Sequence, residues 1–166
     1  MHNKYHGHSN ALSAFSGAFL VLLAVTSFAA ESAKEDEVDA ETHCLALNIY
    51  WEARSEFLEA QRAVAFTVLN RVRHSDFPGS ICAVVKEGGE SGACQFSWWC
   101  DRLADNPTDE SAWATAKSVA KRVRSELHED PTSGALFYHH KSIMPHWSHE
   151  MVEVTTIGDH VFYKRR

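Results

Sequence analysis

Hydrophobic residues recur at helical spacing in three stretches of the chain. These stretches predict helices over about 41–54, over about 58–73, and from a Thr108 cap to the break at Asp130-Pro131. The inward stripe of the second helix consists of Gln61, Val64, Ala65, Val68, Leu69 and Val72. That of the third consists of Trp113, Ala116, Val119, Ala120, Val123 and Leu127. A shorter helix is expected over 80–86, after the turn signal Phe77-Pro78-Gly79.

The pattern changes after the third helix. Residues 135–140, 151–157 and 160–164 are short segments rich in aromatic and β-branched residues, which is typical of strands. Gly158-Asp159 predicts a tight hairpin between the last two. Helices followed by a small antiparallel sheet indicate an α+β fold. Between the helices, residues 87–106 combine glycines, two cysteines and several aromatic residues, which predicts a long functional or cross-linked loop.

The N-terminal part has a different composition from this domain. The apolar stretch 14–25, followed by small residues at 27 and 29, predicts a secretory signal peptide over residues 1–29. An uncleaved membrane anchor is the alternative. An acidic linker is expected over 30–41, and a single folded domain over 42–166.

The net charge narrows the choice of partner. The chain carries −6, and removal of the predicted signal peptide takes away only Lys4 among its charged residues, leaving −7. Such a balance argues against nucleic acid as a partner. It does not exclude a polysaccharide, which is bound through hydroxyl groups and sugar faces.

Four cysteines in an exported domain predict two disulfides. Three connectivities are possible, and we favour Cys94–Cys100 as a local clip, which leaves Cys44–Cys82. A zinc site with histidine ligands is the competing interpretation. The spacing of Cys94 and Cys100 is not that of a CxxC zinc knuckle.

Glu52 is the strongest candidate for chemistry. Leu45, Asn48, Ile49 and Glu52 share one face of the first predicted helix, so Glu52 should point inward. Desolvation raises the pKa of a carboxyl group, and an acid still protonated near neutral pH can act as a general acid. The alternative is a structural glutamate paired with Arg54 or another cation.

Seven blocks of the sequence carry a family resemblance. They are Cys44–Arg54, Ala63–Val72, Phe77-Pro78, Cys82–Val85, Cys94–Asp101, Tyr138-His139 with Pro145 and Trp147, and Ile157–Tyr163. In this order they resemble the SleB-type cell wall hydrolases, the spore-cortex-lytic enzyme family. The resemblance implies a lysozyme-like catalytic domain that cleaves peptidoglycan between N-acetylmuramic acid and N-acetylglucosamine.

The resemblance also assigns residues to roles. It makes Glu52 the catalytic glutamate. The substrate-binding residues that it implies are Gln95, Phe96, Ser97, Tyr138 and His139. Core packing is the alternative for Phe96 and for Trp98. The sequence departs from the family at Ser55 and Arg102, where glycine is usual, which bears on specificity more than on proton transfer.

A second carboxylate is needed by ordinary glycosidases but not by lytic transglycosylases, which the resemblance favours. The candidates Glu56, Glu59 and Asp101 are expected to be solvated surface charges. His140, His146 and His149 are also expected at the surface, because they form no recognisable metal motif. Neither a metal nor another cofactor is expected.

The sequence therefore predicts an exported, monomeric enzyme that acts on peptidoglycan glycan strands, in the periplasm or the cell wall, by lytic transglycosylation to 1,6-anhydro ends. The alternatives are a hydrolytic muramidase, a non-catalytic glycan-binding module and a zinc-dependent hydrolase. Membrane contact is expected only through an uncleaved signal segment.

Overall fold

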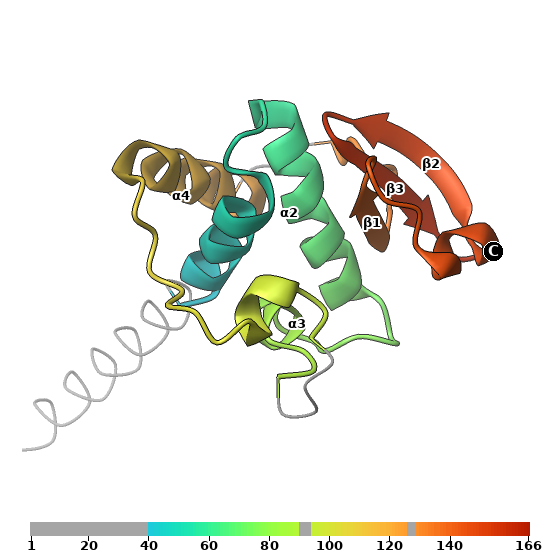
Figure 1. Cartoon of the computed structure of the whole chain (residues 1–166), viewed down its shortest axis with the longest axis horizontal. Coiled ribbons are helices and arrows are strands. Elements are labelled where there is room, and N and C mark those ends of the chain that lie inside the picture. Colours follow the sequence, from blue (N-terminus) through green and yellow to red (C-terminus); the bar gives the residue numbers. More distant parts are fainter. Residues whose placement is uncertain (1–39, 90–93, 126–128) are drawn as a thin grey trace, which may run out of the picture. The chain divides into compact units, whose positions relative to one another are not determined.

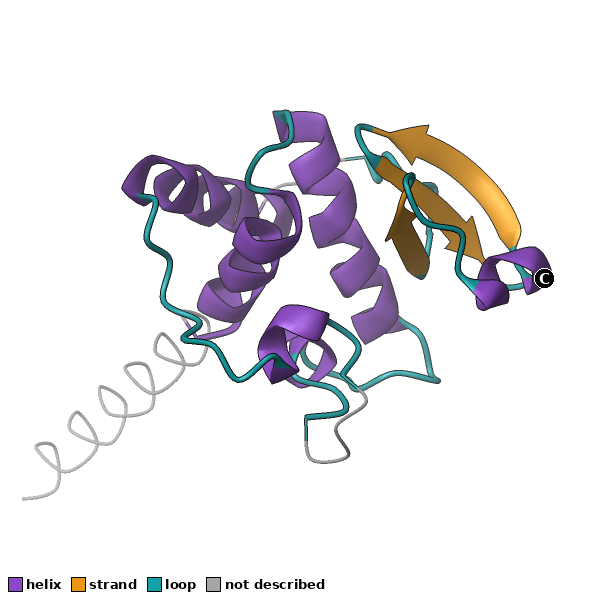
Figure 2. Ribbon diagram, viewed as in Figure 1, coloured by secondary structure: helices purple, strands orange, loops and turns teal. Residues whose placement is uncertain are grey.

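The computed structural model describes residues 40–89, 94–125 and 129–166. It has a helix over 40–53, followed by α2 (Leu58–Arg73), α3 (Ile81–Val85), the 3-10 helix η1 (Ser97–Cys100), α4 (Glu110–Ser125), β1 (Phe137–His140), the 3-10 helix η2 (His146–Glu150), β2 (Val152–Ile157) and β3 (His160–Lys164). In this described part, α2 lies between the other helices and the sheet (Figure 1). The α-helices and the strands occupy separate regions, with the short η2 beside the sheet (Figure 2), which confirms the α+β prediction. The predicted signal peptide and nearly all of the acidic linker lie outside the described residues.

α2 has the bounds that its hydrophobic period predicts. Its 16 residues include neither glycine nor proline, and Arg71 and Arg73 lie in the last turn, where cations interact favourably with the helix dipole. Ten of the 16 residues are buried, because α2 packs against helices on one side and the sheet on the other. Both of its faces therefore contribute to the core.

The helix over 40–53 is fastened to α3 by two kinds of bond. Cys44 forms a disulfide with Cys82, with the two Cα atoms 5.2 Å apart. The Glu41 carboxylate accepts hydrogen bonds from the backbone amides of Ile81 (2.6 Å) and Cys82 (3.3 Å), which have no partner inside the short helix. The second disulfide, Cys94–Cys100, spans η1. This is the pairing favoured from the sequence.

α4 begins one residue later than its predicted cap implies. Asp109, not Thr108, caps the helix, because the Asp109 carboxylate accepts a hydrogen bond from the Ala112 amide at 2.9 Å. The Thr108 and Asp109 amides both donate to the Tyr50 hydroxyl, at 3.1 and 3.0 Å. Tyr50 therefore fixes the start of α4 against the first helix. Residues 126–128, where the end was predicted, lie outside the described residues.

The sheet has the strand order β1-β3-β2, and both pairings are antiparallel. His140 and Ile157 both align with His160, at the ends of the two pairings. β1 begins at Phe137, two residues later than predicted. The reason is that Ala135 and Leu136 direct their carbonyl groups to side chains of α2.

Two consecutive polar residues at the end of α2 make this connection. The Asn70 amide donates to the Ala135 carbonyl at 3.1 Å and to Asp130 at 2.8 Å. The Arg71 Nε donates to the Leu136 carbonyl at 2.7 Å, and Arg71 is only 2% exposed. The segment that leads into β1 is thus hydrogen-bonded to α2 before the sheet begins.

Asp130 organises the turn that precedes β1. Its carboxylate accepts hydrogen bonds from the Thr132 amide and hydroxyl (2.8 and 2.7 Å) and from the Gly134 amide (2.6 Å), in addition to Asn70. Burial raises the pKa of Asp130, but these hydrogen bonds outweigh burial and hold the pKa below its usual value. The turn therefore depends on an ionised carboxylate.

Across the described residues, no helix combines the length and the apolar character needed to cross a membrane.

Replacement of Gly158, the glycine of the β2–β3 hairpin, is expected to destabilise the fold. Its φ is +62°, and an added Cβ would meet the Ala60 Cβ of α2 at 2.9 Å as well as the Glu56 carboxylate. Gly158→Ala should lower the free energy of unfolding by about 1–3 kcal/mol, as measured by urea denaturation. Gly79→Ala is the control, because nothing lies within 4 Å of its added Cβ. Equal stability of the two variants would contradict this account.

Candidate functional site

A cavity of about 430 Å³ opens between the first helix, the η1 loop and the sheet. Its lining residues are Glu52, Arg71, Cys94, Gln95, Phe96, Ser97, Tyr138, His139, His140, Ile143, Pro145, Trp147 and His160. All six candidate catalytic and substrate-binding residues named from the sequence are among them. The fold thus brings together residues from three segments that are far apart in the chain.

Glu52 reaches this cavity because of the helix face that carries it. Leu45, Asn48 and Ile49 on the same face are fully buried. Glu52 lies in the last turn of the helix and is half-buried, so its carboxyl group lines the cavity while the rest of the face enters the core. The inward direction predicted from the period is confirmed.

The environment of Glu52 favours a protonated carboxyl group. Burial raises its pKa, and this effect outweighs two opposing ones. The opposing effects are a hydrogen bond from the Tyr138 hydroxyl to Oε2 at 3.1 Å and the charge of Arg71. Arg54 does not pair with Glu52; its guanidinium lies over the rings of Tyr50 and Trp51, 5.0 Å from each centroid.

Tyr138 connects the sheet to the acid. It lies on β1, and its ring packs against Phe162 of β3 and Phe96 of the η1 loop, at centroid distances of 5.6 and 6.5 Å. Burial raises the pKa of Tyr138 well above 10, and the neighbouring Glu52 raises it further. The Tyr138 hydroxyl therefore stays protonated and donates the hydrogen bond to Glu52.

The η1 loop supplies one wall of the cavity. Gln95 and Ser97 are exposed, whereas Phe96 between them is buried but still lines the cavity. Phe96 therefore belongs to both the groove and the core. Trp98 is a core residue; it is buried and stacks on Trp51 with a centroid distance of 6.4 Å.

His139 is held by internal hydrogen bonds. Its Nδ1 lies 3.0 Å from the His140 carbonyl, so Nδ1 carries the proton, and the Tyr163 hydroxyl donates to Nε2 at 3.0 Å. Both ring nitrogens are thus used within the protein. The His139 ring lines the cavity while it stacks on Tyr163 and packs edge-on against Trp147.

His160 was not singled out from the sequence, yet it lies in the cavity wall. It is buried, its ring packs edge-on against Tyr138 at 5.2 Å, and its Nδ1 has no hydrogen-bond partner among the described residues. Burial, followed by the nearby His140, lowers its pKa to about 4. His160 is therefore neutral near pH 7.

Arg71 is the second functional candidate that sequence reasoning missed. The signal was present, since Arg71 follows Val64 by seven positions and Val68 by three and so continues their buried face. Val72, which was assigned to that face instead, is only half-buried.

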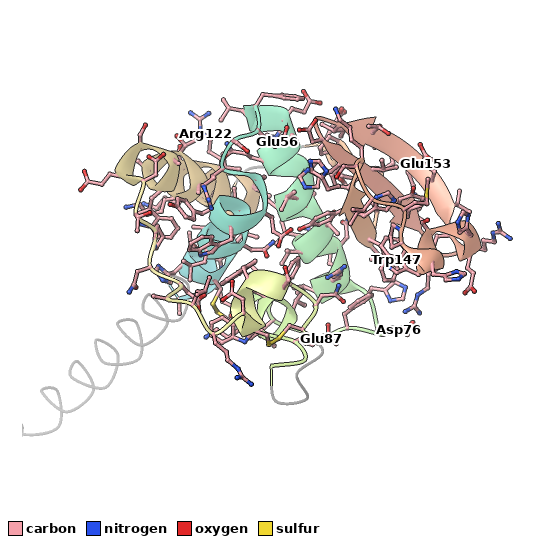
Figure 3. The ribbon with its side chains drawn as sticks, in the orientation of Figure 1. Glu56, Asp76, Glu87, Arg122, Trp147 and Glu153 are labelled. Atoms are coloured by element: carbon pink, nitrogen blue, oxygen red, sulfur yellow. A yellow bond between two sulfur atoms is a disulfide. The ribbon has the colours of Figure 1, made fainter. Side chains whose placement is uncertain are left out.

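The other candidate acids lie elsewhere. Glu56, Glu59 and Asp101 do not line the cavity, and Glu59 and Asp101 are exposed. Glu56 lies beside the N-terminal end of α2 (Figure 3), next to Gly158. Among the described lining residues, Glu52 is the only carboxylic acid.

The prediction that the remaining histidines lie at the surface holds in part. His140, His146 and His149 are all exposed, but His140 also lines the cavity. In the described ranges no three potential ligands cluster in a way that could hold a metal ion.

Arg102, where the family usually has glycine, has a φ of 65°, in the left-handed region that favours glycine.

Comparisons with known proteins agree with this architecture. Residues 55–163 match a family described as cell wall hydrolase. The match begins three residues after Glu52 and therefore does not include it. A spore cortex-lytic enzyme of Bacillus cereus is 28% identical over 119 residues, which cover 70% of this chain and 41% of that protein. The chain thus spans less than half the length of this relative.

Two solved structures are similar. The catalytic domain of the Bacillus cereus SleB protein gives a TM-score of 0.51 at 26% identity, covering 75% of this chain and 89% of that one. The catalytic domain of a germination-specific lytic transglycosylase, SleB from Bacillus anthracis, gives a TM-score of 0.56 at 26% identity. The match covers 75% of this chain and 93% of that one. These matches confirm the predicted family resemblance and fold class.

The Tyr138 hydroxyl should determine how far the Glu52 pKa rises. Tyr138→Phe removes a hydrogen bond that favours the charged carboxylate, so the Glu52 pKa should increase further. The measurement is a pH titration of the Glu52 side-chain carboxyl resonance by carbon-13 NMR. Tyr163→Phe is the matched control, because its hydroxyl bonds His139 instead. An unchanged or lower Glu52 pKa in Tyr138→Phe would contradict the assignment.

Proposed function

The chain belongs to the cell wall hydrolase family, and we propose that it is an exported enzyme that cleaves peptidoglycan between N-acetylmuramic acid and N-acetylglucosamine, with Glu52 as the acid. The observation that carries the proposal is the half-buried Glu52 with a raised pKa in a cavity large enough for sugar rings. A protein that only binds glycans has little use for a carboxyl group desolvated at this cost.

The reaction follows from a single proton donor. Glu52 protonates the oxygen that leaves with N-acetylglucosamine, and the bond from the muramyl C1 to that oxygen breaks. The muramyl C6 hydroxyl then bonds to C1, and its proton returns to Glu52. The products are a free 4-hydroxyl on N-acetylglucosamine and a 1,6-anhydromuramyl end, and water is neither consumed nor released.

The composition of the cavity favours this route over hydrolysis. Retaining glycosidases place a second carboxylate roughly 5 Å from the acid, and inverting ones place it farther away to activate water. Among the described residues that line the cavity, Glu52 has no such companion. The similar Bacillus anthracis structure belongs to a lytic transglycosylase, which supports the same choice.

Location and partners follow from the substrate. Peptidoglycan lies outside the cytoplasmic membrane, so the proposal requires export, for which the predicted signal peptide over 1–29 provides the means. The glycan strand is the proposed partner, and the net negative charge of the chain is consistent with recognition through hydroxyl and acetamido groups.

Glu52→Gln tests the proposal directly. The amide keeps the size of the side chain but supplies no proton, so cleavage of purified peptidoglycan should fall by a factor on the order of 100 or more. Glu59→Gln, which changes an exposed acid outside the cavity, should keep wild-type activity. The readout is release of soluble muropeptides, with thermal melting to show that both variants fold.

Mass spectrometry of the wild-type products completes this experiment. A 1,6-anhydro end is one water lighter than a reducing end. Full activity of Glu52→Gln would overturn the assignment of the acid. Products with reducing ends would leave Glu52 as the assigned acid but would show that the reaction is hydrolysis and not transglycosylation.

The single-acid mechanism also predicts which acids are dispensable. Glu56→Gln and Asp101→Asn should each retain measurable cleavage, because a true nucleophile or base would lose most of the rate when converted to its amide. Glu90→Gln is included because Glu90 lies outside the described residues. Loss of a hundredfold in any of these variants, with an unchanged melting temperature, would identify a second carboxylate.

A further inference from the structure

A second cavity adjoins the first. It measures about 320 Å³ and is lined by Arg71, Gln95, Phe137, Tyr138, Trp147 and Met151. Four of these residues, Arg71, Gln95, Tyr138 and Trp147, also line the cavity of Glu52. The two cavities therefore share a wall, and a sugar beside Glu52 would have the second cavity next to it.

The second cavity combines apolar sides with one cation. Phe137, Trp147 and Met151 are half-buried and supply the apolar surface (Trp147 is labelled in Figure 3). Arg71 supplies the cation; its guanidinium is fixed by the bond to Leu136 and lies 5.4 Å from the Phe96 ring and 5.6 Å from the Phe137 ring. This composition fits a short alkyl group that carries an oxygen acceptor.

The Arg71 guanidinium has hydrogen-bond donors that no described residue uses. Its Nη1 is buried and has no hydrogen-bond partner among the described residues. Burial lowers the Arg71 pKa, and the nearby Tyr138, Glu87 and Glu52 oppose this effect. Among the described residues, the guanidinium makes one hydrogen bond, from Nε to the Leu136 carbonyl. Buried guanidinium groups normally make hydrogen bonds through their amino groups, so an acceptor is missing here.

We propose that the second cavity binds the lactyl group that distinguishes N-acetylmuramic acid from N-acetylglucosamine. Its methyl group packs against Phe137, Trp147 and Met151, and its carbonyl or carboxylate oxygen accepts from Arg71. The inference takes from the proposed function only that the substrate is a peptidoglycan glycan. The lactyl group is attached to O3 of the muramyl ring, and the adjoining cavity receives it when that ring lies beside Glu52.

The subsite would determine which bond is cleaved. A strand alternates two sugars whose rings are otherwise alike, so without a muramyl-specific contact both kinds of linkage would fit equally well. With the lactyl group in the second cavity, the muramyl C1 is the anomeric carbon presented to Glu52. The same contact excludes chitin, whose sugars lack the lactyl group.

Binding to the Glu52→Gln variant tests this without requiring turnover. The ligands are the tetrasaccharide of two alternating N-acetylglucosamine–N-acetylmuramic acid units and the chitin tetrasaccharide, measured by calorimetry. The muramyl ligand is expected to bind at least about tenfold tighter, or about 1.4 kcal/mol. A muramyl ligand with its carboxyl groups converted to methylamides shows whether Arg71 receives a carboxylate or an amide carbonyl, since only the former depends on charge.

Variants of Met151 test the location of the subsite. Met151 lines only the second cavity, so Met151→Trp, which fills it, and Met151→Asp, which repels a carboxylate, should each abolish the preference and leave chitin tetrasaccharide binding unchanged. Leu103→Trp is the control for an added indole, at a position that is 74% exposed and lines neither cavity. It should keep the preference.

The outcomes separate this inference from the proposed function. Equal binding of the two tetrasaccharides, no binding of either, or a preference that survives in both Met151 variants would overturn the lactyl subsite, whether or not the enzyme cleaves peptidoglycan. A muramyl preference that is lost in the Met151 variants supports the subsite. It does so even where wild-type protein releases no muropeptides, a result that would refute the proposed function alone.

Discussion

The hydrogen bonds from the end of α2 to the segment before β1 are the interaction on which the site depends. Asn70 and Arg71 bind successive backbone carbonyls of that segment, two and one residues before the strand begins. This contact sets where β1 starts and therefore where Tyr138 lies. Tyr138 meets Glu52 across 86 positions of sequence, so the hydrogen-bond partner of Glu52 comes from a strand whose start is fixed by α2.

Arg71 contributes to both the fold and the candidate site, because one guanidinium is hydrogen-bonded to the segment before β1 and acts on Glu52. Its Nε is used by the fold, whereas its charge opposes the effect of burial on Glu52, and the residue lines both cavities. A buried charge is costly unless it is hydrogen-bonded, and the surrounding phenylalanine rings recover part of that cost through cation–π contacts. The position therefore suits arginine better than lysine, whose compact charge lacks a planar fork.

Periodicity predicted the parts of the structure that a local pattern determines. The bounds of α2 and the inward face of Glu52 follow from spacing alone, and the hairpin at Gly158 follows from its turn residues. What spacing could not give was the partner of each polar residue. Arg71 was given no role from the sequence because its acceptor, the Leu136 carbonyl, is 65 residues away. The Asp109 cap was missed because the preceding Thr108 is also a residue type that caps helices. The match of the family blocks supplied the groove residues that tertiary folding brings together.

The turn built on Asp130 makes the stability of the fold depend on pH on the acid side. Its carboxylate must be ionised to hold the turn, and its lowered pKa means that this contribution is present at neutral pH and is lost as the pH falls through the folded-state value. The proposed role of Glu52 has the opposite requirement, since its proton is lost as the pH rises through its elevated pKa. Two carboxyl groups of the same small domain thus have their pKa values displaced in opposite directions by their surroundings, one so that it stays ionised to hold a turn and the other so that it keeps a proton to a higher pH.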